Sequence, residues 1–336
     1  MADAPLAPFR CAPRFVARAW GDGARLRARF DLDAPPGTGE AWLVSDVDGA
    51  PSAVLDGPFA GRTLRDVFTD ARAALVGDST GEDFPLLVKL IDINAPLSVQ
   101  VHPDGPTARA LGDGRRGKAE AWLVVDAGPG AKVSLGLREA LSPDEVVRLA
   151  GTGGLEAALR TEPARAGQAY EILPGTLHTA LDLVALEVQE TADVTYRVYD
   201  WGRDRPLHLE QARETLARTG GAARRPRIVD VPPAPDAARR MALVSGEAPF
   251  TFDVVDLPRG ARADLGAGPA IAFALDGDVT LETPAGSLSL RRGEAAVVPA
   301  AAGALVARPG DGPARLAHAA ARPGAAPGRL GHETVS

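Results

Sequence analysis

Two imidazoles, one carboxylate and one amide occur at spacings that would let them hold a metal ion. Gln100 and His102 lie two residues apart in the apolar segment 98–104, and alternate side chains of a strand point to the same face. Glu120 comes shortly after this segment, and His178 follows a Pro-Gly turn further along the chain. Nitrogen and oxygen donors of this kind suit a divalent ion such as zinc. Gln100, His102, Glu120 and His178 are therefore the predicted metal ligands.

The metal prediction depends on the convergence of these four residues, because a single histidine on a strand is more often a core or surface residue. Glu40 is an alternative carboxylate, since the pentapeptide Glu-Ala-Trp-Leu-Val begins both there and at Glu120. Glu120 is preferred because it closely follows the Gln-x-His strand. Among the other histidines, His208 is interpreted as structural, and His318 and His332 as surface or tail residues.

The elements that must position these side chains are mainly strands. Short apolar runs bounded by glycine, proline and aspartate recur along the chain, and this pattern favours a mainly β protein. The expected strands are residues 41–47, 86–93, 121–125, 169–173, 184–188, 194–199, 270–275, 279–282 and 295–299.

Three helical patterns interrupt the strands. Thr63 is a candidate N-cap for apolar residues at helical spacing up to Leu75. Ser142 begins a Ser-Pro-Asp-Glu sequence, which is typical of a capping box with proline at the first helical position. The third helical pattern covers residues 209–218.

Composition limits the class of protein. A chain of 336 residues exceeds the usual size of a single core, so two packed units are expected. The net charge of −7 argues against a nucleic-acid or anionic-membrane partner. Cys11 is the only cysteine, arginines interrupt the apolar residues near the start, and no run of about 18 apolar residues occurs. A cytoplasmic protein is expected.

The two expected units differ in their capacity to bind a metal. We predict a metal-binding unit over residues 1–223, a proline-rich linker over 224–239, a second β unit over 240–321 and a flexible tail over 322–336. In the first unit, a glycine turn is followed by a short strand that ends in proline, and His178 comes four residues later. The same pattern recurs in the second unit, where Gly303 stands in place of the histidine. The second unit is therefore expected to bind no metal.

Four motifs together resemble the class I, cupin-type mannose-6-phosphate isomerases, and they cover most of the chain in order. The length resembles that of the short bacterial branch. The similar segments are Phe-Pro-Leu-Leu-Val-Lys at residue 84 with Gln-Val-His-Pro-Asp at residue 100, Gly-Lys-Ala-Glu-Ala-Trp at residue 117, Pro-Gly-Thr-Leu-His at residue 174, and Thr-Tyr-Arg-Val-Tyr-Asp at residue 195.

The resemblance implies two cupin-like (jelly-roll) β-barrels with a few inserted helices, and a reversible conversion of mannose 6-phosphate to fructose 6-phosphate. It implies that one Zn²⁺ per chain, or another divalent ion, is bound by the four residues named above. It also implies that Arg197 faces the active site, and that Ser98 and Lys118 lie near the substrate phosphate. The sequence departs from the family pattern at Asp22, Gly105 and the alanines that flank Glu120, and none of these changes removes a ligand.

The isomerisation requires an electrophile for the developing oxyanion of an enediolate and a base near C1 and C2 of the open-chain sugar. Glu187 is the first candidate for the base, and Lys118 is the alternative proton carrier. Arg197 could neutralise the enediolate or bind the phosphate, and its structural alternative is an ion pair with Asp193 or Asp200.

Two other classes of protein were compared with the isomerase. A metal-dependent oxygenase usually needs more imidazoles or a facial triad, and a non-catalytic sugar-binding barrel would be favoured by a lost ligand. Neither pattern fits the four donors. The expected partner is a small sugar phosphate, and the expected state is a monomer.

Overall fold

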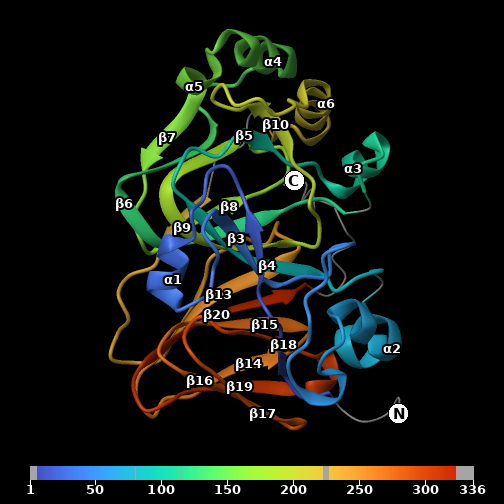
Figure 1. The fold of residues 1–336 in the computed structure, drawn as a ribbon, viewed down its shortest axis with the longest axis vertical. Helices are drawn as coiled ribbons and strands as arrows, with labels where there is room; N and C mark the ends of the chain where they lie inside the picture. The colour runs from blue at the N-terminus through green and yellow to red at the C-terminus, as the bar shows by residue number, and fades with distance from the viewer. Residues whose placement is uncertain (1–5, 80, 115, 222–226, 323–336) are drawn as a thin grey trace, which may run out of the picture.

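The computed structural model describes residues 6–79, 81–114, 116–221 and 227–322, and within them the strands form three antiparallel sheets of ten, six and four strands. The sheets lie in layers, with the four-stranded sheet at the bottom of Figure 1 and the six-stranded sheet above it. The ten-stranded sheet follows, and helices α4 (Pro143–Thr152), α5 (Leu155–Ala158) and α6 (Leu209–Thr219) lie at the top. The expectation of a mainly β protein is confirmed.

The ten-stranded sheet carries all of the predicted site residues or the turns next to them. Its main path runs in the order β11 (Arg227–Asp230), β8 (Gln168–Ile172), β6 (Glu120–Leu137), β9 (His178–Glu190), β4 (Leu86–Ile93), β3 (Thr38–Val44) and β2 (Arg14–Ala17). Three strands lie off this path: β5 (Val99–Val101) pairs with β9 and with β10 (Tyr196–Tyr199), and β7 (Leu159–Pro163) pairs with β6.

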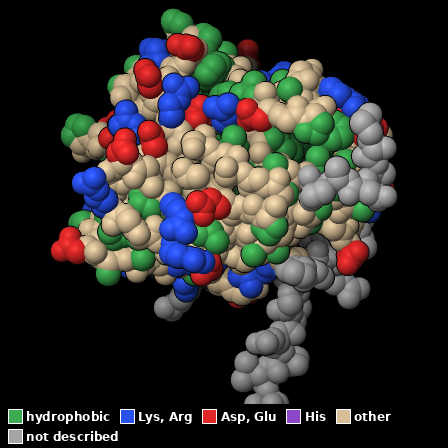
Figure 2. All heavy atoms as spheres, turned by 90° about the horizontal axis from the view of Figure 1, so that it is seen from below, with side chains coloured by type: hydrophobic (Ala, Val, Ile, Leu, Met, Phe, Trp, Pro, Cys, Tyr) green, Lys and Arg blue, Asp and Glu red, His purple; other side chains and the backbone are tan. Residues whose placement is uncertain are grey.

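The other two sheets come almost wholly from the C-terminal third of the chain. The six-stranded sheet has the order β1 (Phe9–Arg10), β18 (Ala295–Val298), β15 (Ala270–Asp276), β20 (Ala314–Ala321), β13 (Phe250–Leu257) and β12 (Arg239–Ala242). The four-stranded sheet has the order β14 (Ala263–Ala267), β19 (Ala304–Pro309), β16 (Val279–Thr283) and β17 (Gly286–Leu290). Figure 2 views the molecule from this end, where basic and acidic side chains are intermixed.

The predicted helix starts are confirmed. Helix α2 (Leu64–Val76) begins after Thr63, and α4 begins after Ser142 with a complete capping box. Helix α6 corresponds to the third predicted helix. The remaining helical elements are α1 (Ala24–Phe30), α3 (Gly105–Leu111), and the short 3-10 turns η1 (Gly57–Phe59) and η3 (Ala300–Ala302).

Alternation along the strands creates separate apolar layers. On β4, Val88 and Leu90 pack between the ten-stranded and six-stranded sheets, in the same cluster as Phe252 and Phe273. Ile91 and Ile93 face the opposite side of the ten-stranded sheet, together with residues such as Trp122. Successive side chains of a strand point to opposite faces, so Lys89 lies on the Ile91 side. A buried lysine is thereby placed on the face that holds the candidate site.

The structure adds detail to the expected division of the chain. Residues 227–230 of the expected linker form β11, which pairs with β8. At the other end, β1 pairs with β18, so residues near the start of the chain join the C-terminal sheet. The expected flexible tail lies outside the described residues except for Arg322.

No helix in the described ranges combines the length and the apolar character needed to cross a membrane.

Candidate metal centre and adjoining cavity

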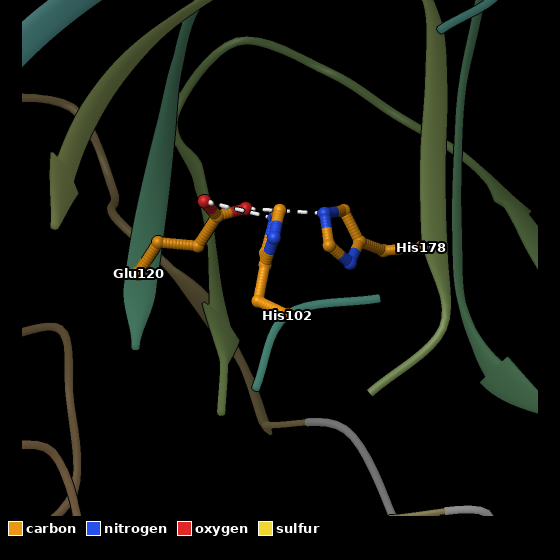
Figure 3. Close-up of side chains that lie close together, drawn as sticks. All are labelled: His102, Glu120 and His178. Atoms are coloured by element: carbon orange, nitrogen blue, oxygen red, sulfur yellow. Dashed lines mark ion pairs between the residues drawn. The ribbon is translucent and has the colours of Figure 1, made fainter. Parts of the chain in front are cut away.

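Three of the four predicted ligands converge in a buried cluster. His102 follows β5 directly, while Glu120 and His178 are the first residues of β6 and β9. Their candidate ligand atoms all lie within 4.8 Å of one another, and each side chain is buried. Glu120 Oε2 is 3.4 Å from His102 Nε2, and Glu120 Oε1 is 3.2 Å from His178 Nε2. Figure 3 shows both imidazoles directed toward the carboxylate.

Hydrogen bonds to backbone carbonyls fix which nitrogen of each imidazole carries the proton. His102 Nδ1 donates to the Val194 carbonyl at 3.0 Å, and His178 Nδ1 donates to the Thr176 carbonyl at 2.9 Å. A carbonyl oxygen can only accept, so each neutral ring directs its Nε2 lone pair toward Glu120. This arrangement is typical of imidazoles that bind a metal.

The protonation states of His102 and Glu120 also suit a cation. Burial and the nearby Lys118 ammonium lower the pKa of His102 to about 3, so this imidazole is neutral at physiological pH. Burial opposes ionisation of Glu120, yet Lys118 and the imidazoles hold its pKa well below the usual range. The buried Oε1 atom of Glu120 accepts no hydrogen bond from any described residue. Two lone pairs and a carboxylate oxygen thus converge, and this donor set fits a divalent ion.

Gln100 lies at the edge of the cluster. It is paired with His178 across β5 and β9, and its amide Nε2 is 3.0 Å from His178 Nε2. Ser98 Oγ donates to Gln100 Oε1 at 3.3 Å. The amide oxygen and nitrogen of Gln100 share one carbon, so a rotation of the terminal amide would direct the oxygen toward the imidazole. Gln100 therefore lies beside the cluster, and its role as a ligand stays a prediction.

Lys118 connects the cluster to the adjoining cavity. Its Nζ lies 2.7 Å from Glu120 Oε2 and 3.2 Å from His102 Nε2, and the side chain is buried. Burial opposes the charge, but the carboxylates of Glu120 and Glu187 raise the pKa of Lys118 above its ordinary value. Lys118 is therefore a permanent ammonium group beside the predicted metal ligands.

The cavity has a volume of about 290 Å³ and contains both charged and aromatic side chains. All of the predicted substrate and catalytic residues line it. The complete lining is Arg18, Trp20, Glu40, Lys89, Ile91, Leu97, Ser98, Gln100, Lys118, Trp122, Glu187, Asp193, Thr195, Arg197, Arg205 and His208.

Glu187 is fixed by partners on both neighbouring strands. It faces Lys89 of β4 and Trp122 of β6 in the strand register. Lys89 Nζ lies 3.1 Å from Glu187 Oε1, and Trp122 Nε1 donates to Glu187 Oε2 at 2.8 Å. The ammonium of Lys89 also lies over the Trp42 ring, 4.9 Å from its centroid. The ion-pair partner of Glu187 is therefore a lysine.

Glu40 belongs to the cavity and lies outside the metal cluster. Arg18 donates to its Oε2 at 2.9 Å and Trp42 Nε1 donates to the same atom at 2.7 Å. Burial opposes ionisation, but Lys89 and Arg18 lower the pKa of Glu40 to about 2. The repeated pentapeptide thus places one carboxylate with the histidines and the other on the cavity wall.

Arg197 forms no ion pair with any described carboxylate, so the alternative pairing with Asp193 or Asp200 was wrong. Asp200 instead binds Arg203 and Arg205. The Nε atom of Arg197 donates to the Pro206 carbonyl at 3.1 Å. Burial and the neighbouring Arg205 lower the pKa of Arg197 from its ordinary value.

Two histidine interpretations need correction. His318 is buried on β20, paired with Asp253 and Ala272, and is therefore not a surface residue. His208 does have a structural contact, because its Nδ1 accepts the Arg197 backbone N–H at 3.1 Å, but it also lines the cavity. His332 lies outside the described residues.

Sequence reasoning missed Arg18, Lys89 and Arg205 as cavity residues. Lys89 had a visible signal, because a charge inside the apolar run 86–93 indicates a buried polar environment. Arg18 and Arg205 had no such signal, because their position at the cavity depends on contacts between segments that are distant in the sequence.

The comparisons with known proteins agree with this geometry. Residues 9–119 match the family model of the phosphomannose isomerase type I catalytic domain. The chain is 38% identical over 217 residues to a probable mannose-6-phosphate isomerase of Bacillus subtilis. The aligned region covers 62% of this chain and 68% of that protein. It is also 38% identical over 205 residues to a mannose-6-phosphate isomerase of Streptococcus mutans, covering 59% and 64%.

Solved structures extend the similarity to nearly the whole chain. A crystal structure of the mannose 6-phosphate isomerase from Bacillus subtilis matches with a TM-score of 0.78 and 29% identity, over 94% of this chain and 99% of that one. A putative mannosephosphate isomerase from Archaeoglobus fulgidus shares the fold, with a TM-score of 0.73 and 22% identity over 95% and 99% of the two chains.

Proposed function

The chain belongs to the family of type I mannose-6-phosphate isomerases, and from this premise we propose that it interconverts mannose 6-phosphate and fructose 6-phosphate. The observation that carries the proposal is the buried cluster of His102, Glu120 and His178, which Lys118 connects to a cation-lined cavity. The cavity offers the charges that an anionic sugar requires.

We propose that Zn²⁺ is the resident metal, held by His102, Glu120 and His178 with Gln100 as the fourth ligand. When bound, a divalent ion supplies Lewis acidity toward the oxygens of the sugar. The Val194 and Thr176 carbonyls hold the two rings so that both Nε2 atoms stay directed to the centre.

Glu187 is the proposed base for proton transfer between C1 and C2 of the open-chain sugar. Its carboxylate lines the cavity and is held by Lys89 and Trp122, so it is oriented before the substrate arrives. The raised pKa of Lys118 disfavours its role as the alternative proton carrier, and its ammonium instead offers a positive charge to an oxyanion.

Ser98, Lys118 and Arg197 are the proposed substrate-binding residues. Arg197 has a guanidinium group without a carboxylate partner among the described residues, and it can donate two parallel hydrogen bonds to an anionic oxygen pair. Depending on how the sugar lies, these oxygens belong to the enediolate or to the phosphate group.

The finer architecture is also a proposal. We propose that residues 1–223 form a metal-binding cupin-like barrel and residues 240–321 a second barrel that binds no metal. The apolar layer between the six-stranded and ten-stranded sheets supports a monomer in which one unit covers a face of the other. The single cysteine, Cys11, is buried and unpaired, which suits the reducing environment of the cytoplasm.

The test is a coupled assay of mannose 6-phosphate conversion on metal-loaded and chelator-treated protein. We expect one metal ion per chain, loss of turnover with the chelator and recovery with zinc. His102→Ala and His178→Ala should lose the metal and reduce kcat by roughly 1,000-fold, because several kcal/mol of charge stabilisation disappear.

His208→Asn is the matched control, because His208 lines the same cavity outside the cluster and this variant should retain the metal. One bound metal ion per chain without turnover of mannose 6-phosphate would contradict the substrate assignment.

A further inference from the structure

The five cations that line the cavity differ in how their charges are balanced. Three of them have a carboxylate of their own: Arg18 pairs with Glu40, Lys89 with Glu187 and Lys118 with Glu120. Arg205 shares the buried Asp200 with Arg203. Arg197 has no carboxylate partner among the described residues. The excess positive charge of the lining therefore belongs to Arg197 and Arg205, which are near enough for Arg205 to lower the pKa of Arg197.

Arg205 is held in a fixed orientation by Asp200. Its Nε atom donates to Asp200 Oδ2 at 2.7 Å, and its Nη2 atom donates to Asp200 Oδ1 at 2.6 Å. Such a two-pronged pair uses one edge of the planar guanidinium group. The opposite side, with Nη1, has no acceptor among the described residues, and the side chain lines the cavity.

The segment that carries Arg205 is anchored at both ends and in its middle. The His208 backbone N–H donates to the Arg197 carbonyl at 2.8 Å, which closes residues 197–208 into a loop. Arg203 donates to the Pro96 carbonyl at 2.7 Å, and Trp201 donates to the Leu97 carbonyl. These carbonyls directly precede Ser98, so the loop and Ser98 meet at one corner of the cavity.

We propose that Arg205, oriented by Asp200, binds the phosphate group of the substrate together with Arg197, and that this loop makes the enzyme selective for phosphorylated sugars. A phosphate monoester carries about 1.5 to 2 negative charges at pH 7, which matches the excess charge of the two arginines. Asp193, the exposed carboxylate of the lining, raises the pKa of Arg18 and Lys118, and it forms no ion pair with Arg197 or Arg205 among the described residues. The inference rests on the proposed function, because it assigns the phosphate subsite of the same cavity.

The experiment compares Arg205→Met with Arg203→Met in metal-loaded protein. Arg203 binds the same carboxylate but does not line the cavity, so it is a matched control for disturbance of the loop. We expect Arg205→Met to lower kcat/KM for mannose 6-phosphate by about 10- to 100-fold, mainly through KM, because charged hydrogen bonds to phosphate are lost. The kcat/KM for unphosphorylated mannose should stay within about twofold.

A binding measurement keeps the inference independent of turnover. Trp20 and Trp122 line the cavity, so their fluorescence can report the affinity for inorganic phosphate. Phosphate should bind more weakly to Arg205→Met than to Arg203→Met. If Arg205→Met does not fold, Arg205→Lys replaces it in the comparison.

Equal phosphate affinity in the two methionine variants, or an unchanged preference for mannose 6-phosphate over mannose, would overturn the inference. Weakened phosphate binding in a protein that turns over no mannose 6-phosphate would contradict the proposed function and leave the phosphate site in place.

Discussion

At the scale of single residues, the cavity holds two buried glutamates with different surroundings. Glu120 meets two imidazole lone pairs and an ammonium group, whereas Glu187 meets the ammonium of Lys89 and the indole of Trp122. The first environment suits a metal ligand, because the ammonium group keeps the carboxylate ionised and the donor atoms of all three ligands lie close together. The second leaves the carboxylate on the cavity wall, where it can contact a substrate.

A glutamine at Glu187 would keep the shape of the side chain but could no longer accept a proton. We expect Glu187→Gln to reduce kcat by about 100- to 10,000-fold, which is the usual contribution of a positioned base. Elemental analysis should find the same metal content as in the wild type, in contrast to the histidine variants.

Glu40→Gln is the comparison for this prediction, because Glu40 is also a buried cavity carboxylate paired with a cation. If both variants lose kcat to the same degree, Glu187 has no special role in proton transfer.

Local patterns were sufficient to predict that His102, Glu120 and His178 lie together, and the structure places these three side chains in one cluster. They could not show that Lys89 orients Glu187, since that contact depends on the register between β4 and β9. They also failed for His318, because an exposed and a buried histidine on a strand look the same without the partner sheet.

At the scale of elements, β4, β6 and β9 supply the rigid frame of the site, and helices α4 and α6 cover strand β10. Residues 86–93 were predicted with the observed bounds, because an apolar run ends on both sides at turn residues. The observed β6 and β9 are much longer than predicted, since glycine and aspartate inside them are accommodated by register shifts. Helices α1 and α3 were missed because each is only seven residues long.

Removal of the α4 cap should affect stability more than catalysis. The Ser142 side chain accepts the Glu145 backbone N–H at 3.2 Å, and Glu145 Oε2 accepts the Ser142 backbone N–H at 2.8 Å. We expect Ser142→Ala to lower the free energy of unfolding by about 1 kcal/mol in urea titrations. Ser142→Asp should retain most of the stability, because aspartate also caps helices. An alanine variant as stable as the wild type would show that tertiary packing alone holds the start of α4.

At the scale of the whole molecule, buried carboxyl groups should make stability depend on pH. Burial raises the pKa of Glu190 to about 7, although the Ala119 N–H donates to its Oε2. In the unfolded chain this carboxyl would ionise near pH 4.3. Between these values the folded protein binds more protons than the unfolded chain, so stability falls as pH rises from about 4.5 to 7.

In the wild type, we expect Glu190 to lower the free energy of unfolding by roughly 2 to 3 kcal/mol between pH 5 and pH 8. Glu190→Gln should lose most of this decrease. The urea titrations are made in the presence of a chelator, so that protons released on metal binding do not contribute to the pH dependence of the stability. Glu40→Gln is the control, because the pKa of Glu40 is lowered to about 2 and its contribution does not change between pH 5 and 8. A pH profile of Glu190→Gln parallel to the wild type would show that Glu190 is ionised in the folded protein throughout.

The pairing of β1 with β18 has a consequence for how the protein is made. Phe9 and Arg10 are translated long before their partners Val297 and Ala296. The metal cluster, whose residues all precede β10, can assemble before those partners are translated. This pairing therefore joins two segments that are far apart in the sequence, and such a distant contact forms slowly because a long loop must close.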